Sequence, residues 1–300
     1  MDLTAMEGFR EAVGTSGPVC VRGGRTRWNI GREESSIWTG EPIREVVAPA
    51  GIEAFEPAEM TVSAGAGTTL EELAAALEAQ GQEVALEGPS GATIGGSLMV
   101  GWSPLRRGTL GETTDALLQA DCVGADGVRF TAGGPTVKNV TGYDLCRLLV
   151  GSLGTLALVG RVILRTRPIP ESSRWLAGPV EQSVVRKLVH RAATVLWDGS
   201  QTTVLIEGHE VDVRDQTKRL KSAGLSEVEL PELPPFRERW SGALPSGGVL
   251  QIGAGVVHSW KSPVAPQVAP GIAALALRLR DIFDPERRLN PQCDPHLVAA

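Results

Sequence analysis

The sequence predicts an α+β fold with two domains, and three observations carry this prediction. The 36 glycines of the 300-residue chain are concentrated before residue 160, where they separate short apolar runs typical of β-strands. An Asp126-Gly127 turn between two such runs is typical of a β-hairpin. After Pro170, strand-like and helix-like patterns alternate, which favours helices on one face of an antiparallel sheet. We therefore expect a first domain over residues 1–169 and a smaller α+β domain over residues 170–270.

One helix and several strands are expected in the first domain. The helix is predicted at Thr69–Gln80, because apolar residues recur at helical spacing, a threonine can cap its start and Gly81 ends it. Pro168 and Pro170 interrupt the last strand pattern, and we place the domain boundary there. The strands are predicted at Val19–Arg22, Thr61–Ala64, Ala116–Val123, Val128–Thr131 and Leu156–Arg167.

Alternation along the last of these strands places Arg161, Arg165 and Arg167 on one face. Arginines in such a row could bind a carboxylate or a protein partner, or they could simply face solvent. We expect a solvated strand face, because single charged rows on strands most often contact water.

The second domain is predicted to alternate strands and helices. Its irregular linkers are expected at residues 231–235 and 263–270, which are rich in proline. A last helix is predicted near Ile272–Phe283, within a C-terminal segment, residues 271–300, that returns to the first domain. The elements before the linkers are strand Ser173–Ala177, helix Val180–Leu196, strand Thr202–Glu207, helix Val211–Ala223 and strand Ser226–Leu230.

Composition excludes several classes of protein. The net charge is −6 with no basic block, which argues against nucleic-acid binding. The apolar runs are too short to span a bilayer, and the N-terminus lacks an export signal, so we expect a cytoplasmic protein without membrane insertion. The four cysteines form no Cys-x-x-Cys pair, which argues against a zinc or iron–sulfur cluster.

The Gly65-Ala66-Gly67 turn resembles the start of a dinucleotide fingerprint. The third glycine of that fingerprint is replaced by Leu70, where close packing of helix on strand requires no side chain. Glu71 and Glu72 also place negative charge at the helix start, where a pyrophosphate would have to lie. We therefore interpret this segment as a plain strand–turn–helix connection.

Four other loops are better candidates for binding a large anionic ligand. In the first, successive glycine N–H groups and a threonine hydroxyl can converge on an anion, with Arg22, Arg25 and Arg27 adding positive charge. The others expose small residues and backbone donors in the same way. The loops are Gly23-Gly24-Arg25-Thr26, Gly91–Ser97, Arg106–Thr109 and Gly151–Thr155.

The order and the sequences of these loops resemble those of the PCMH-type FAD-binding domain of vanillyl-alcohol-oxidase-type flavoproteins. The likeness rests on Arg22–Thr26, on Ala92–Gly96 and most specifically on Val137–Leu145, which continues through Arg147–Leu156. This last passage is similar to the D and E subunits of bacterial glycolate oxidases, as are Phe283-Asp284-Pro285 and Leu289-Asn290-Pro291. The resemblance implies an FAD-binding domain of two α+β subdomains, followed by a small α+β cap or substrate domain.

The resemblance also implies which residues bind the cofactor. The first loop would hold the pyrophosphate, the central loop would run beside it and the ring system, and the later residues would approach the flavin, the ribityl chain or the adenine. Tyr143 could instead be a core residue and Asn290 a helix-terminating turn. The residues are Arg22, Gly23, Gly24, Arg25, Thr26, Ala92, Thr93, Ile94, Gly95, Gly96, Ser97, Gly108, Gly142, Tyr143, Asp144, Gly154, Val159 and Asn290.

Departures from the family pattern refine these expectations. Members with covalent flavin carry a histidine near the first loop, where this chain has Arg25, so the resemblance implies non-covalent FAD. The D-type subunits supply metal-binding histidines, whereas the four histidines here show no ligand spacing, so we expect no metal and a likeness to the E type. His258 is the histidine that best fits a functional role.

The resemblance implies an FAD-dependent oxidoreductase that oxidises a small 2-hydroxy acid within a glycolate oxidase-like complex. Its protein partners would be a D-type flavin subunit and an iron–sulfur subunit. Two alternatives stay open at this point: a non-catalytic FAD-binding assembly subunit, and an NAD(P)H-dependent flavin reductase on the same fold. The sequence assigns no catalytic residue.

Overall fold

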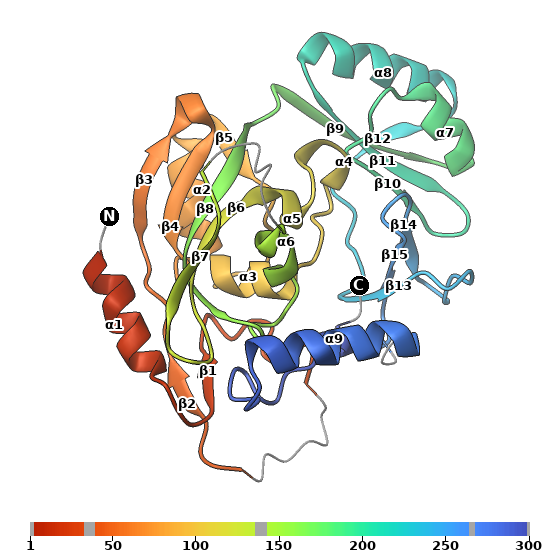
Figure 1. The fold of residues 1–300 in the computed structure, drawn as a ribbon. Helices are drawn as coiled ribbons and strands as arrows, with labels where there is room; N and C mark the ends of the chain where they lie inside the picture. The colour runs from red at the N-terminus through yellow and green to blue at the C-terminus, as the bar shows by residue number, and fades with distance from the viewer. Residues whose placement is uncertain (1–2, 33–39, 136–142, 264–267, 299–300) are drawn as a thin grey trace. The chain divides into compact units, whose positions relative to one another are not determined.

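The computed structural model describes residues 3–32, 40–135, 143–263 and 268–298, and the chain divides into two compact units (Figure 1). Unit 1 contains Met1–Trp102, Glu112–Pro168 and Pro266–Val298. Unit 2 contains Ser103–Gly111 and Ile169–Ala265. Both units combine helices with sheets, as the α+β prediction requires. The segment Ser103–Gly111 belongs to unit 2, although the sequence prediction placed it in the first domain.

Unit 1 contains two sheets. In the smaller, β1 (Val19–Val21) pairs in parallel with β2 (Arg44–Val46). In the larger, the strand order is β3-β4-β8-β6-β7, with β5 paired to β8, and all pairings are antiparallel. The strands are β3 (Ile52–Glu56), β4 (Thr61–Gly65), β5 (Gln82–Val84), β6 (Leu117–Val123), β7 (Arg129–Gly133) and β8 (Leu158–Pro168). The predicted hairpin is confirmed as β6 and β7, and the long predicted strand as β8.

The helices of unit 1 pack with these sheets around a large apolar core. The predicted capped helix is confirmed as α2, because the Thr69 hydroxyl accepts a hydrogen bond from Glu72 N at 3.2 Å. Ile94, Leu98 and Leu289 are fully buried in this core, so the second glycine loop and the C-terminal segment both belong to it. The helices are α1 (Leu3–Val13), α2 (Leu70–Glu78), α3 (Ile94–Val100), α5 (Thr113–Ala116), α6 (Leu145–Leu149) and α9 (Pro270–Phe283), with short 3-10 turns η1 (Pro57–Glu59) and η2 (Pro295–Leu297).

Unit 2 is a seven-stranded antiparallel sheet with two helices packed on one face, besides the short α4 (Arg107–Leu110). Val185 of α7 and Val213 and Leu220 of α8 join the sheet residues in one apolar cluster. The strand order is β12-β9-β11-β10-β14-β15-β13. The bounds are β9 (Ser172–Gly178), α7 (Gln182–Leu188), β10 (Thr194–Trp197), β11 (Thr202–Gly208), α8 (Glu210–Ser222), β12 (Ser226–Val228), β13 (Phe236–Arg239), β14 (Val249–Gln251) and β15 (Val256–Ser259).

The predicted helix Val180–Leu196 is wrong in its second half. Helix α7 ends at Leu188, and Thr194–Trp197 forms β10. This strand is paired on both sides, with β11 and with β14. Pairing on both edges and burial of Val195 and Leu196 outweigh the helical pattern that continues into this segment.

Across the helices that the structure describes, none is both long enough and apolar enough to cross a membrane.

His258 makes the stability of unit 2 dependent on pH. It is 7 % exposed on β15, and burial, together with repulsion by Arg237, lowers its pKa from 6.5 to about 4. The unfolded chain therefore binds the proton more tightly, so folding stability is complete above about pH 6.5 and falls by about 3 kcal/mol as the pH drops towards 4. We expect His258→Gln to flatten this part of the curve of unfolding free energy against pH. Parallel curves for the variant and the wild type would contradict this assignment.

Candidate functional site

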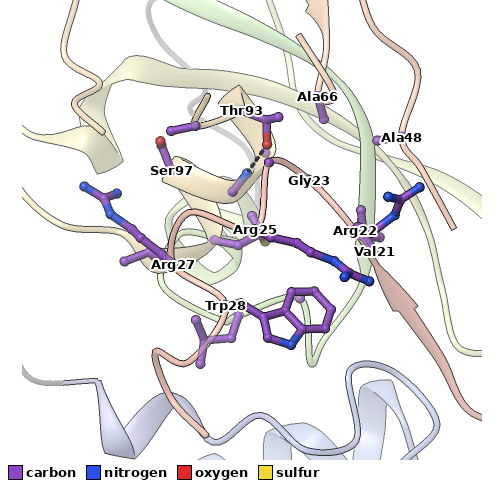
Figure 2. A pocket seen from close by; sticks show the side chains of 18 of the residues that line it. Val21, Arg22, Gly23, Arg25, Arg27, Trp28, Ala48, Ala66, Thr93 and Ser97 are labelled. Carbon is purple, nitrogen blue, oxygen red and sulfur yellow. Dashed lines mark hydrogen bonds between the residues drawn. The ribbon is translucent and has the colours of Figure 1, made fainter. Parts of the chain in front are cut away.

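Unit 1 contains a pocket where six described chain segments converge (Figure 2). Atoms leave about 940 Å³ unfilled there, a volume that includes open solvent. The segment after β1 forms one wall, and α3, the turn before β8 and the residues after α9 form the others. The lining residues are Val21–Trp28, Ile30, Arg32, Ala48, Ala66, Gly67, Ala92, Thr93, Gly95–Ser97, Met99, Val100, Leu153, Gly154, Leu158, Val159, Asn290 and Cys293.

The first glycine loop lies against the second with no room for side chains. A Cβ atom on Gly24 would lie 1.7 Å from the Gly91 carbonyl oxygen, and one on Gly23 would lie 2.6 Å from Thr93 Oγ1. Arg25 adopts a left-handed conformation with φ of 56°, which turns the chain at the end of the pair. In the described residues, the backbone N–H groups of residues 23–26 donate to no other residue. Four consecutive donors therefore line the pocket and are available to a ligand.

The second glycine loop is held by the turn that precedes α2. Leu70 N donates to Ala92 O at 2.8 Å, Ile94 N to Thr68 O at 2.9 Å, and Gly95 N to Ala66 O at 2.7 Å. These bonds place Ala66 and Gly67 in the pocket wall. The turn dismissed as a dinucleotide fingerprint thus contributes to the pocket, but as a backbone support for the neighbouring loop.

The charge in the pocket is positive. Arg22, Arg25, Arg27 and Arg32 line it, and none of the lining residues that the structure describes is Asp or Glu, although the Glu45 carboxylate pairs with Arg22 and Arg25. The guanidinium carbons of Arg25 and Arg32 lie over the Trp28 ring, 5.1 and 4.2 Å from its centre. A pocket with four guanidinium groups and a row of peptide N–H donors is suited to a ligand that carries phosphate or carboxylate groups.

Asn290 connects two walls of the pocket. Its amide Oδ1 accepts from Val21 N at 3.2 Å, and its Nδ2 donates to Leu153 O at 2.6 Å. Its own N–H donates to Val19 O at 2.9 Å, and its φ of 41° lies in the left-handed region. The segment after α9 therefore fixes the end of β1 against the turn before β8.

The structure places the predicted site residues in three groups. Thirteen of them line the pocket: Arg22, Gly23, Gly24, Arg25, Thr26, Ala92, Thr93, Gly95, Gly96, Ser97, Gly154, Val159 and Asn290. Four do not: Ile94 is fully buried, Gly108 belongs to unit 2, Tyr143 is 95 % exposed and Asp144 caps α6 through Arg147 N. Gly142 lies outside the described residues, as does the rest of its motif over 136–142.

The reasons for these differences are local. Ile94 alternates with its pocket neighbours and points into the core from the first turn of α3. Gly108 approaches Ala192, whose carbonyl oxygen would lie 2.1 Å from an added Cβ, so this glycine serves packing within unit 2.

Sequence reasoning missed several lining residues, among them Trp28, Arg32, Met99 and Cys293. Trp28 and Arg32 follow the first glycine loop within a few positions, and that proximity was the available signal. For Cys293 the sequence contains no such signal, because this residue lies in the pocket only where the C-terminal segment returns to the first domain. Burial raises the pKa of its thiol, although Arg32 and Arg280 act in the opposite direction.

The comparisons with known proteins agree with this geometry. Residues 9–133 match the family model described as "FAD binding domain". This chain carries a PCMH-type FAD-binding domain. Its cofactor is FAD, and the matched range includes the first and second glycine loops but not the turn before β8 or Asn290.

Curated relatives of this chain include two glycolate oxidase subunits and a D-lactate dehydrogenase. The glycolate oxidase subunit GlcE of Escherichia coli is 32 % identical over 171 residues, 56 % of this chain and 47 % of that protein. A D-lactate dehydrogenase of Archaeoglobus fulgidus is 32 % identical over 166 residues, 54 % of this chain and 36 % of that protein. The glycolate oxidase subunit GlcD of Bacillus subtilis is 40 % identical over 84 residues, 28 % of this chain and 18 % of that protein. The matches thus span less than half of each relative.

Solved structures confirm the fold of the FAD-binding chain. Two crystal forms of an alkyldihydroxyacetonephosphate synthase superpose with TM-scores of 0.57 and 0.56 over 74 % of this chain. They cover 49 and 50 % of that chain at 13 and 14 % identity, so this likeness concerns the fold alone.

The pocket fits FAD by two observations of its own. The unpaired N–H groups of residues 23–26 and the nearby arginines suit a pyrophosphate. The Ser97 hydroxyl is buried, belongs to the lining and has no hydrogen-bond partner among the described residues. A buried hydroxyl without a partner is costly, and a polar ligand in the pocket would relieve that cost.

Removing the Asn290 amide should destabilise the FAD-binding domain. We expect Asn290→Ala to lower its free energy of unfolding by about 2 to 4 kcal/mol, because Val21 N and Leu153 O both lose a partner and alanine is strained at this φ. Denaturant unfolding of the FAD-free protein measures the change. Asn290→Gly, which tolerates the φ but also lacks the amide, should lose less. Unfolding free energies equal to that of the wild type in both variants would contradict a structural role for this side chain.

Proposed function

We propose that the chain binds FAD non-covalently and takes part in the FAD-dependent oxidation of a small 2-hydroxy acid, as a subunit of a glycolate oxidase-like complex. The observation that carries the proposal is the cationic pocket whose wall is a row of free peptide N–H groups. The relatives support the choice of substrate class, because they include two glycolate oxidase subunits and a D-lactate dehydrogenase. Non-covalent attachment is supported by the first glycine loop, which has Arg25 where covalent members of the resembling family carry a histidine.

Each part of the pocket would have a separate task. The N–H groups of residues 23–26 would hold the pyrophosphate, and Gly95 and Gly96 would allow the cofactor to approach the backbone of α3. Val159, at the start of β8, would offer backbone groups to the adenine end of the cofactor. Bound FAD would supply the electron acceptor for the substrate, and the protein would supply orientation and electrostatics.

The subunit role is part of the proposal. Two of the relatives are described as subunits of glycolate oxidase, one of E type and one of D type. We propose that this chain associates with a D-type flavin subunit and an iron–sulfur subunit, through which the electrons leave.

Anaerobic reduction of the FAD-loaded chain tests the proposed function. Addition of glycolate or D-lactate should bleach the visible flavin bands, either with the chain alone or only when the partner subunits are present. Bleaching by NADPH with no response to either acid would favour a flavin reductase. If FAD is firmly bound but none of these conditions bleaches it, the chain would be a non-catalytic assembly subunit, and the proposed oxidation of a 2-hydroxy acid would be wrong.

A further inference from the structure

The four arginines of the pocket differ in what their side chains contact. Arg25 and Arg22 lie 2.6 and 3.4 Å from the Glu45 carboxylate, and Arg32 Nη1 donates to Gln292 Oε1 at 2.7 Å. The Arg27 side chain forms no hydrogen bond or ion pair with any residue that the structure describes. Its guanidinium therefore keeps five N–H donors that the described protein does not use.

Arg27 is held in place without being neutralised. It is partly buried, and its guanidinium carbon lies 4.7 Å from the centre of the Trp102 ring. The backbone of Trp102 is fixed in turn, because its carbonyl oxygen accepts from Thr113 Oγ1 at 2.7 Å. Burial lowers the pKa of Arg27, and the attraction of Glu87 opposes this only in part. A cation that has lost hydration and forms no ion pair with a described residue gains most from an anionic ligand.

The direction of Arg27 separates it from the other cations. Figure 2 shows its side chain extending on the side of Ser97, whereas Arg22 and Arg25 extend to the opposite side of the loop. The pyrophosphate is the anionic part of FAD, and the N–H groups of residues 23–26 already form a site for it. Arg27 would then be available to a second anion.

We propose that Arg27 binds the carboxylate of the acid substrate in this pocket, an inference that rests on the proposed function. The planar guanidinium can hold both carboxylate oxygens at once, which would orient a small 2-hydroxy acid. Arg27, which directly follows the first glycine loop, would thereby make the site bind acids in preference to neutral alcohols.

Binding of oxalate tests the assignment, because oxalate is a carboxylate that offers no C–H bond to oxidise. We expect Arg27→Met to weaken oxalate binding to the FAD-loaded protein about 30-fold or more, measured by calorimetry and by the flavin difference spectrum, since a bidentate charged contact is lost. FAD affinity of the same variant, measured by fluorescence quenching, should stay within about threefold of wild type. Arg27→Lys should recover part of the oxalate affinity. Arg278→Met, at an exposed arginine of α9, controls for the change in net charge and should change neither affinity.

Three results would overturn the assignment, and each points elsewhere. Loss of FAD affinity in Arg27→Met, in step with the loss of oxalate affinity, would make Arg27 a ligand of the cofactor phosphates. If Arg27→Met binds oxalate as tightly as the wild type, the proposed 2-hydroxy-acid substrate would stand, but a residue other than Arg27 would bind its carboxylate. Wild-type protein that binds FAD but neither oxalate nor D-lactate would overturn both the 2-hydroxy-acid substrate and this role.

Discussion

Gly24→Ala should abolish retention of FAD. The added Cβ would lie 1.7 Å from the Gly91 carbonyl oxygen and 2.8 Å from its carbon, so the backbone of one glycine loop has to move. The moved atoms include the N–H donors that would hold the pyrophosphate. We expect the dissociation constant of FAD to rise at least about 100-fold, roughly 2.7 kcal/mol, and the variant to be purified colourless. Fluorescence titration with FAD measures the effect.

A glycine elsewhere provides the matched control. Gly8 lies within α1, and an added Cβ there meets no atom within 4 Å. Gly8→Ala should therefore keep FAD affinity and gain about 0.5 to 1 kcal/mol of stability, as expected for alanine in a helix. A Gly24→Ala protein with wild-type FAD affinity would show that the close packing of the two loops is not needed for binding.

Arg288→Ala should cause the largest loss of stability. Arg288 is 4 % exposed, and its guanidinium donates to five backbone carbonyl oxygens: Val13 at 2.9 Å, Gly14 at 3.2 Å, Ser16 at 3.0 Å, Gly17 at 2.9 Å and Ala125 at 2.6 Å. Asp284 fixes its backbone by accepting from the N–H groups of Arg288 and Leu289. Alanine removes all five hydrogen bonds, and among the described residues only Val13 O and Ser16 O keep a second donor, from Arg44. We therefore expect a loss of about 4 kcal/mol or more and a melting temperature lower by roughly 10 °C.

Two further variants separate the contacts of Arg288 from its charge. Arg288→Lys keeps the charge but offers three donors from one point, so it should recover less than half of the lost stability. Arg278→Ala, at an exposed position of α9, should change stability by no more than about 0.5 kcal/mol. Equal melting temperatures for Arg288→Ala and Arg278→Ala would contradict the role of Arg288 in joining the C-terminal segment to the N-terminal turn.

The parts of the site that the sequence predicted well are those set by local chemistry. The pair Gly23 and Gly24 predicts that another backbone segment approaches closely, and Thr69 predicts the start of a helix. Both predictions use only a few neighbouring residues. The hairpin around Asp126-Gly127 is local in the same sense. Such features need no knowledge of the distant chain.

The parts that could not be predicted depend on long-range contacts. Arg288 and Asn290 act on residues up to 275 and 269 positions away. Arg161 was expected to face solvent, but it is 7 % exposed and bonds to Asp121 at 2.9 Å, from the neighbouring β6, and to Glu53 at 2.6 Å, from β3 beyond β4. The end of α7 was likewise decided by strands that pair with β10 from later in the chain. A single sequence does not show which residues form these contacts, because many carboxylates could pair with Arg161 and many strands could pair with β10.

The absorption spectrum of the purified chain, recorded before and after acid precipitation, tests the central claim most directly. We expect visible flavin bands in the native protein and their full release into the supernatant, because the proposed site holds FAD through N–H groups, arginines and packing alone. Colour that stays with the precipitate would contradict non-covalent binding. A colourless protein that also fails to take up added FAD would contradict the function of the pocket itself.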